Sequence, residues 1–408
     1  MHTPPEKRTI ALFNYGGGMR GLIPAHLMTR MEDMTGLRMA EMVDIFTGPS
    51  TGSILNAAMT LRHPDEPSQP KYRARHMVRF YEREGAEIFP ADSFREFRGL
   101  MRDLNNRTLK FNKFDSILKH GHYDPGNLSA ALRALLGDAY LKDSLRSLII
   151  PTYNIDGQLK VGEDRVVDHG GRAVWLKNIR TGYPAEAARN TPDVRLYDAV
   201  MASCAAPTYF PCHHFMMQQP GHPENTYISG IDGCIFDNPC ITYMGAVRQH
   251  VPEDHKLTMI VLGTGNTNKS IRKDDWNRFG ALGVVDPAND LPLINIFFNG
   301  PESALLDAFE AEMKENLFVL NKPLLGPADD RTPSAEIDDG SPQNLKRMRF
   351  FAEDILEENA KAFDQICHIL VDNRDRKSRE FETRKKKARM KNFFTLLTGS
   401  DDTERREN

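Results

Sequence analysis

The sequence predicts an α/β fold with a mostly parallel sheet, because two consecutive segments follow the order strand, glycine turn, helix. Residues 9–36 comprise a short apolar run, three consecutive glycines and then apolar residues at helical spacing. Residues 42–61 repeat this order, with the glycine turn at residues 48–52. Strands that alternate with helices usually pair in parallel.

The rest of the chain adds strands, a helical insertion and a helical extension. The charged stretch at about residues 71–145 is helix-like, with breaks at Pro90 and at residues 120–122, and is expected to be a helical insertion. Further strands are expected at residues 147–153, 226–231 and 257–262, and a further helix at residues 196–204.

The boundaries follow from changes in composition. Residues 1–325 are expected to form one α/β unit, and residues 326–343, rich in Pro, Asp and Gly, a polar linker. Apolar residues then recur at intervals near 3.6, so residues 344–373 are expected to form one amphipathic helix that packs on this unit. Residues 374–408 form a basic tail.

Composition limits the compartment and the partners. The net charge of the 408 residues is only -3, so it favours neither an anionic nor a cationic partner. It gives no indication of nucleic-acid binding. The first eight residues lack the apolar run of a secretory signal, and no segment approaches the roughly 18 apolar residues of a membrane span. We therefore expect a cytoplasmic protein whose membrane contact, if any, is peripheral.

Five cysteines at irregular spacing are expected to be free thiols. The run Cys212-His213-His214 could suggest a metal site, but neither a C-x-x-C pair nor an H-E-x-x-H helix accompanies it. Packing in a loop or in the core is the simpler interpretation, and no metal is expected.

The pentapeptide at residues 48–52 reads G-x-S-x-G between an expected strand and an expected helix. A serine on such a turn is exposed at the carboxyl edge of the sheet, and flanking glycines let the strained turn close. Free backbone N–H groups at the helix N-terminus favour negative charge there. Ser50 is therefore a candidate nucleophile.

A serine hydroxyl needs a base at neutral pH, and two kinds of base are available. A Ser-acid-His order would require a late histidine, for which His250, His255 and His368 are candidates. Asp232, followed by glycine after the strand-like residues 226–231, is a carboxylate alternative. An Asp-Gly pair at a strand end is in itself often only a turn.

The glycine run that begins at Gly16 also matches the dinucleotide fingerprint G-x-G-x-x-G. That motif needs an acidic residue about 20 positions later at the end of a second strand, where this chain has the serine turn instead. The loop also offers adjacent backbone N–H groups, which suit an oxyanion hole. We favour the oxyanion hole.

Taken in order, these motifs resemble the signature of patatin-like phospholipases. The signature consists of Gly16-Gly17-Gly18-x-Arg20-Gly21, then Gly48-x-Ser50-x-Gly52, then Asp232-Gly233. Residues 205–211 are similar to that family's segment upstream of the aspartate, and residues 338–341 with the helix after them resemble the end of the plant patatin domain. The resemblance begins near residue 10 and covers most of the chain.

The resemblance implies a three-layer α/β fold and a Ser50–Asp232 catalytic dyad. It also implies an oxyanion hole at Gly16, Gly17 and Gly18 with Arg20 nearby, and cleavage of fatty acyl esters from phospholipids or other acyl lipids at a membrane surface. Neither a metal nor an organic cofactor is implied, and some family members need a small-molecule or protein activator. Partial burial of Asp232 is expected, since a carboxylate needs a raised pKa to act as a base near pH 7.

Three residues depart from the family pattern, namely Tyr15, Pro49 and Cys234. None removes a reacting group, but Tyr15 could reshape the loop and Pro49 lacks a backbone donor next to the nucleophile. These departures leave an alternative open, a catalytically weak domain that binds membranes or a protein partner. If an alcohol rather than water accepted the acyl group, the activity would be transacylation.

The basic tail contains four apolar residues at spacing i, i+3, i+4 and i+7, beginning at Met390. A helix there would have an apolar stripe flanked by Lys and Arg, the composition of an interfacial membrane anchor. A solvated or disordered tail, or docking of Phe393 and Phe394 on the protein's own core, is equally compatible with the sequence.

Overall fold

The computed structural model of the chain describes residues 6–88, 124–161, 165–168, 170–180, 191–207, 209–218, 225–266, 270–284, 292–324 and 330–398. The helix breaks expected at Pro90 and at residues 120–122 lie outside these ranges, as does the end of the tail.

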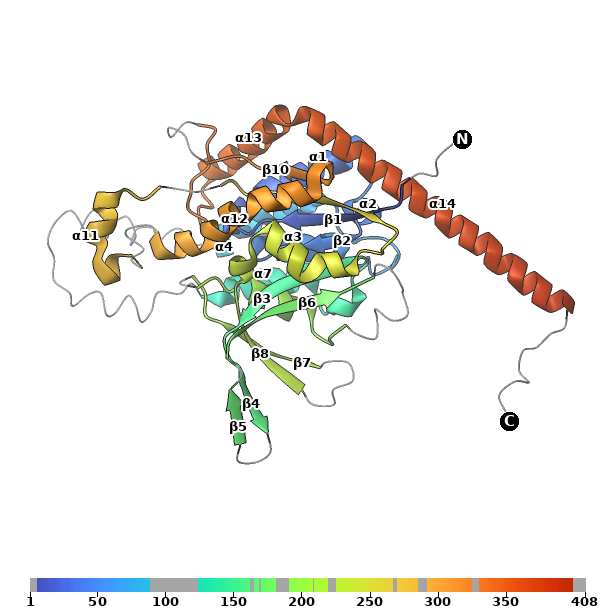
Figure 1. Ribbon diagram of the computed structural model, residues 1–408, viewed down its shortest axis with the longest axis horizontal. Helices are drawn as coiled ribbons and strands as arrows, with labels where there is room; N and C mark the ends of the chain where they lie inside the picture. Colours follow the sequence, from blue (N-terminus) through green and yellow to red (C-terminus); the bar gives the residue numbers. More distant parts are fainter. Residues whose placement is uncertain are drawn as a thin grey trace.

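Within the described residues, eight strands form one mixed, mostly parallel sheet, as predicted (Figure 1). The strand order is β10-β9-β1-β2-β3-β8-β7, and β6 also pairs with β3. The first five of these strands are parallel neighbours, whereas β6 and β8 run antiparallel to β3 and β7 runs antiparallel to β8. The strands are β1 (Arg8–Asn14), β2 (Ile45–Thr47), β3 (Ser147–Asn154), β6 (Arg172–Asn178), β7 (His213–Gln218), β8 (Asn225–Ile231), β9 (Lys256–Leu262) and β10 (Leu317–Leu320).

Helices cover both faces of the sheet, which makes three layers. Successive β1 residues alternate between two apolar clusters, so that Ile10 and Leu12 pack into one layer and Ala11 and Phe13 into the other. Burial of each large side chain contributes about 1.5–3 kcal/mol. The first layer contains α1 (Leu22–Thr35), α3 (Thr51–Thr60), α4 (Ala74–Ile88), α7 (Pro125–Leu136), α9 (Leu196–Ser203), α13 (Pro342–Glu358) and α14 (Ala360–Thr398). The second contains α10 (Pro239–Thr242), the π-helical turn η5 (Tyr243–Val247) and α12 (Pro292–Met313).

Smaller elements complete the fold. They are α2 (Met39–Met42), α11 (Lys273–Gly283), η1 (Gly18–Gly21), η3 (Leu141–Asp143), η4 (Gly233–Phe236), η6 (Arg248–His250) and η8 (Lys314–Asn316). A separate hairpin of β4 (Gln158–Val161) and β5 (Arg165–Asp168) projects from the body (Figure 1).

The second strand is shorter than predicted because a turn of helix precedes it. The Glu41 side chain accepts the Arg38 N–H at 2.7 Å, which closes the first turn of α2. The strand itself spans only Ile45–Thr47. The four helical residues of α2 take the place of the start of the predicted strand.

The carboxyl-terminal region has two helices where the periodicity predicted one. A break at Asn359 separates α13 from α14, and both helices contribute buried apolar residues to the first layer. The segment before α13 is not a loose linker where it is described, because Asp338 is buried and the Ile337 carbonyl accepts the Met19 N–H at 2.7 Å.

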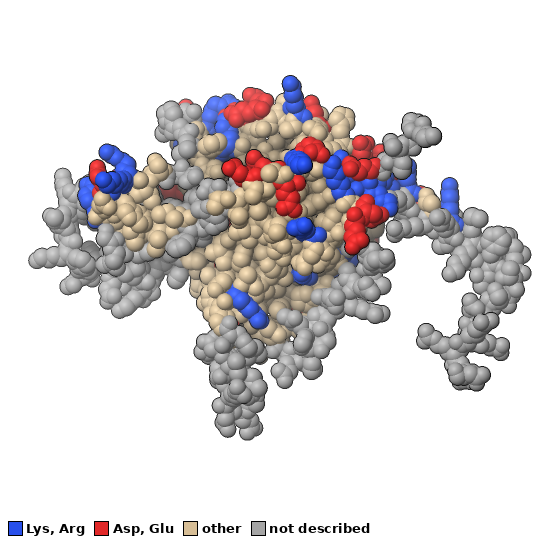
Figure 2. Space-filling model, viewed as in Figure 1, with Lys and Arg blue, Asp and Glu red and all other residues tan. Residues whose placement is uncertain are grey.

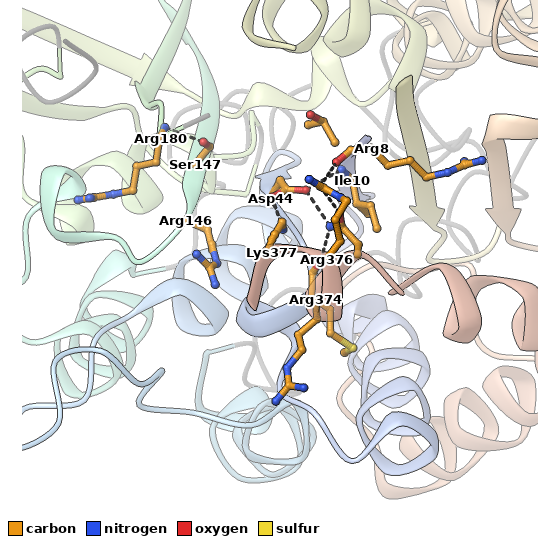
Figure 3. A network of polar contacts seen from close by, with 12 residues as sticks. Arg8, Ile10, Asp44, Arg146, Ser147, Arg180, Arg374, Arg376 and Lys377 are labelled. Atoms are coloured by element: carbon orange, nitrogen blue, oxygen red, sulfur yellow. Dashed lines mark hydrogen bonds and ion pairs between the residues drawn. The ribbon is translucent and has the colours of Figure 1, made fainter. Parts of the chain in front are cut away.

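The segment expected to be a basic tail begins inside the folded part of α14. Lys377 pairs with Asp44, and Arg376 donates to the Arg8 carbonyl at 2.8 Å (Figure 3). Asp44 also accepts the Ile10 N–H at 2.9 Å and the Asn373 amide at 3.0 Å. One carboxylate therefore joins α14 to the amino-terminal edge of the sheet, and the rest of α14 extends away from the body (Figure 1).

Basic and acidic side chains occur together along the upper edge of the face in Figure 2, and the middle of this face carries few of either.

Among the described helices, none has the length and apolar character needed to span a membrane.

Candidate active site

Ser50 lies on a strained turn between β2 and α3. Its φ is 51° and its ψ is -127°, a backbone conformation that costs on the order of 1–3 kcal/mol for a residue other than glycine. A Cβ at Gly48 or Gly52 would lie 2.0 or 2.1 Å from the Asn14 carbonyl oxygen. Both glycines are therefore required so that the turn can close against the end of β1.

Ser203, at the end of α9, supports this turn from behind. The Ser50 N–H donates to the Ser203 carbonyl and to its hydroxyl oxygen, each at 3.1 Å. The Ser203 hydroxyl in turn donates to the Pro151 carbonyl on β3 at 2.7 Å. Two segments that are distant from Ser50 in the sequence, the end of α9 and β3, thus hold the serine backbone in its unusual conformation.

Asp232 follows β8 and lies beside Ser50. Its N–H donates to the Ala205 carbonyl at 2.9 Å, so the segment upstream of the aspartate positions it. A Cβ at Gly233 would lie 2.4 Å from the Pro151 carbonyl oxygen and 3.0 Å from the Pro49 Cβ. Glycine at this position therefore allows Asp232 to approach the serine turn.

Burial raises the pKa of Asp232 from 3.8 to about 7, against the lowering effects of hydrogen bonds from the Ser50 hydroxyl and from Cys234. Only 1% of the residue is exposed, so its burial is more complete than the partial burial that was expected. Its Oδ1 atom has no hydrogen-bond partner among the described residues. The structure thus contains a serine hydroxyl paired with a carboxyl group that titrates near neutral pH.

The glycine loop lies against the serine, since a Cβ at Gly16 would be 3.3 Å from the Ser50 Cβ. The Gly16 N–H donates to both carboxylate oxygens of Asp237, at 2.9 and 3.1 Å. In this structure the Gly16 N–H is therefore already bound to the Asp237 carboxylate. The N–H groups of Gly17 and Gly18 have no acceptor among the described residues.

Arg20 is buried beside this loop. Burial lowers the pKa of its guanidinium to about 10, while the nearby Asp237 and Tyr209 oppose that shift. Its Nε and Nη1 atoms have no hydrogen-bond partner among the described residues. The side chain thus places a positive charge near the glycine loop, partly balanced by the Asp237 carboxylate.

In the described part of the chain, none of the three candidate histidine bases is hydrogen-bonded to Ser50. His250 lies 3.2 Å from the Lys177 ammonium, and burial lowers its pKa to about 4. His255 is hydrogen-bonded to Thr9 at 2.9 Å, next to the first residues of β9 and so at the opposite edge of the sheet. His368 is exposed on α14. Of the candidate bases, the Asp232 carboxylate is the one that is hydrogen-bonded to the serine.

The three departures from the family pattern are accommodated within the site. Tyr15 is buried with its ring edge-on to Phe13 at 5.1 Å, and its N–H continues the pairing with β9 by donating to the Leu262 carbonyl at 3.0 Å. Burial raises the pKa of the Cys234 thiol, next to Asp232. Pro49 accepts the Gly52 N–H at 2.8 Å, so it takes part in the turn through its carbonyl.

The residues at Cys212-His213-His214 are occupied with other contacts or exposed. His213 hydrogen-bonds to Asp198 at 2.8 Å, His214 stacks on Tyr227 and Cys212 is exposed. In the part of the chain that is described, no three His, Cys, Asp or Glu side chains are grouped as metal ligands would be.

Sequence reasoning did not identify Ser203, Asp237 or Thr264. The Thr264 hydroxyl, just after β9, donates to the Gly16 carbonyl at 2.6 Å. Each of these three residues contacts a motif more than 150 positions away. For Asp237 and Thr264 the nearest sequence signal was the glycine-containing turn after β8 or β9, whereas Ser203 ends a helix and has no such signal.

Residues 15–244 match the profile of the patatin-like phospholipase family, and the chain belongs to that family. It is 24% identical over 388 residues to patatin-like protein 2 of Oryza sativa subsp. indica, covering 88% of this chain and 86% of that protein. It is 26% identical over 305 residues to patatin-like protein 2 of Arabidopsis thaliana, covering 69% and 66%. Patatin-16 of Solanum tuberosum is 22% identical over 376 residues, covering 86% and 84%.

Proposed function

We propose that this protein is a phospholipase A-type acyl hydrolase that uses Ser50 as nucleophile and Asp232 as base. The observation that carries the proposal is the pairing of a serine in a strained turn with a buried carboxyl group whose pKa is raised to about 7. A base with a pKa near the working pH is both available in ionised form and strong enough to accept a proton.

In the acylation half-reaction, the Ser50 oxygen attacks the ester carbonyl carbon and its proton passes to Asp232. The N–H groups of Gly17 and Gly18 stabilise the oxyanion, and Arg20 contributes a positive charge nearby. The carbon–oxygen bond to the lysolipid then breaks, and Asp232 returns the proton to the departing alcohol. In the second half-reaction, water attacks the acyl-enzyme, gives a proton to Asp232 and releases the fatty acid, and that proton restores the serine.

The substrate we propose is a phospholipid or a related acyl lipid at a membrane surface, because the chain belongs to the patatin-like phospholipase family. In this mechanism, the side chains and backbone of this chain, together with water, supply every group that acts on the ester. Contact with the bilayer would be peripheral, and residues of α14 beyond the docked part are candidates for it.

The test is labelling by a fluorophosphonate probe, which reacts only with an activated serine. Wild type and the control Ser378→Ala, which alters an exposed serine on α14, should both be labelled, and Ser50→Ala should not. Lipid analysis of a membrane extract should then show free fatty acid and lysophospholipid with wild type but not with Ser50→Ala. Labelling of Ser50→Ala at the wild-type rate would overturn the proposal.

A further inference from the structure

The peptide groups on either side of Gly16 are held by two side chains from distant parts of the chain. Asp237 accepts the Gly16 N–H with both oxygens, and the Thr264 hydroxyl donates to the Gly16 carbonyl at 2.6 Å. Thr264 is only 4% exposed, and it follows β9, whereas Asp237 follows η4. Neither residue contains the reacting atoms of the proposed dyad.

Peptide geometry links the Thr264 contact to the orientation of a backbone donor. The carbonyl of Gly16 and the N–H of Gly17 belong to one planar peptide group, and the described residues contain no cis peptide bond. In a trans peptide the oxygen and the hydrogen point in opposite directions. The Thr264 hydroxyl therefore sets the direction of the Gly17 N–H, which points away from Thr264 and has no acceptor among the described residues.

The next peptide group is oriented in the same way. The Gly17 carbonyl accepts the Arg20 N–H at 3.1 Å, so the Gly18 N–H points to the opposite side. A Cβ at Gly17, where φ is 148°, would lie 2.7 Å from the Thr264 hydroxyl oxygen. Thr264 therefore packs directly on the loop that carries both free donors.

We propose that Thr264 and Asp237 are positioning residues that hold the two peptide groups on either side of Gly16, so that the Gly17 N–H is directed at the oxyanion. This inference rests on the proposed acyl hydrolase function. A preorganised donor stabilises the transition state more than the bound ester, because negative charge develops on the oxygen only as the reaction proceeds. Loss of either support should therefore lower kcat while KM stays nearly constant.

The principal test compares Thr264→Val, which removes the hydroxyl and keeps the shape, with Thr264→Ser, which keeps the hydroxyl. Complete loss of an oxyanion donor costs about 10²–10³ in kcat, so a misdirected donor is expected to cost about 10- to 100-fold with a soluble ester. Thr264→Ser should restore kcat to within a few-fold of wild type. The same loss should occur in the rate of fluorophosphonate labelling.

A matched control is Thr258→Val, six residues earlier on β9. Thr258 is buried and accepts a hydrogen bond from Arg8 at 2.9 Å, at the edge of the sheet away from Ser50. It should lose stability without a loss in kcat. Asp237→Asn is a second variant, which keeps one acceptor for the Gly16 N–H but removes the charge that also faces Arg20, and an intermediate loss in kcat is expected.

The failure of this inference differs from failure of the proposed function. If wild type hydrolyses the ester but Thr264→Val and Asp237→Asn keep kcat within about twofold, or change only KM, the positioning role is wrong and the dyad stands. If wild type shows neither turnover nor labelling of Ser50, the proposed function itself fails.

Discussion

Replacement of Asp232 by asparagine should make the protein more stable, and the gain should depend on pH. Burial raises the pKa of this carboxyl from 3.8 to about 7 in the folded protein. Because the folded-state pKa is the higher one, the contribution of the carboxyl to stability is complete below pH 3.8 and is lost as the pH rises to about 7. Asp232→Asn has no group that titrates here and does not undergo this loss.

The size of the effect follows from the shift. At about 1.36 kcal/mol per pKa unit, the ionised carboxyl costs the folded protein up to about 4 kcal/mol above pH 7. An unfolding entropy of about 2.1 cal/mol/K per residue corresponds to about 0.9 kcal/mol/K for this chain. The difference in Tm between Asp232→Asn and wild type should therefore grow by up to about 5 °C between pH 4 and pH 7.5.

The assay is thermal unfolding of wild type, Asp232→Asn and Ser50→Ala at a series of pH values and constant ionic strength. Ser50→Ala is the matched control, because it removes the nucleophile but keeps the buried carboxyl. Its Tm should fall with pH at least as strongly as that of wild type, since the hydrogen bond from Ser50 that lowers the pKa of Asp232 is lost. The substitution by asparagine can also change Tm by the same amount at every pH. Such a change shifts the whole curve of Tm against pH and does not alter the difference between pH 4 and pH 7.5. Parallel curves for wild type and Asp232→Asn between pH 4 and pH 7.5 would refute the reasoning.

Four further outcomes are expected. The value of kcat/KM for a soluble ester should rise with pH up to about 7 and then level off, because the mechanism needs ionised Asp232; a flat profile from pH 5.5 to 8 would contradict this. Ser50→Ala and Asp232→Asn should each lower kcat by about 10⁴-fold and the double variant by no more than either, since residues that act as one unit are not additive; multiplied losses would show that they act separately. Asp44→Ala should lower stability by about 3 kcal/mol, because it leaves the largely buried Lys377 without its partner, and an unchanged Tm would show that α14 is held by apolar packing alone. Deletion of residues 385–408 should weaken binding to anionic vesicles, as should added salt, while soluble-ester hydrolysis is unchanged; equal vesicle binding by the truncated and intact proteins would exclude the tail as an anchor.

The positions of most central strands could be predicted from the sequence because their signals are local. The apolar runs at β1 and β9 are expected to be strands wherever they occur, since they are too short for helices and end in glycine turns. Local signals were less reliable where a short-range contact competed with them. The Glu41 contact to Arg38 shortened β2, and the apolar periodicity that predicted one helix continues across the break at Asn359.

The two groups proposed to react could be selected from the sequence for a similar reason. The strained turn at Ser50 and the close approach at Gly233 both require glycine next to the residue proposed to react. A short local motif in the sequence therefore indicates each position. These motifs did not decide between Asp232 and a histidine as the base. A base must lie close to the serine, and a local motif does not give that distance. Only the fold placed His255 at the opposite edge of the sheet.

The supporting contacts of the site depended entirely on tertiary structure. Asp237 and Thr264 meet the same glycine from positions 221 and 248 residues away, and an aspartate or threonine after a strand has no local feature that predicts such a contact. The same holds for the pKa of Asp232, which is raised because the assembled fold removes water from the carboxyl. The sequence alone thus indicated which groups to propose as reactive, since side-chain chemistry and backbone permissiveness belong to individual residues. The fold decided which backbone N–H groups of the glycine loop lack an acceptor among the described residues, and how the Asp232 carboxyl titrates. Hydrogen bonding and desolvation depend on neighbours that only the folded chain brings together.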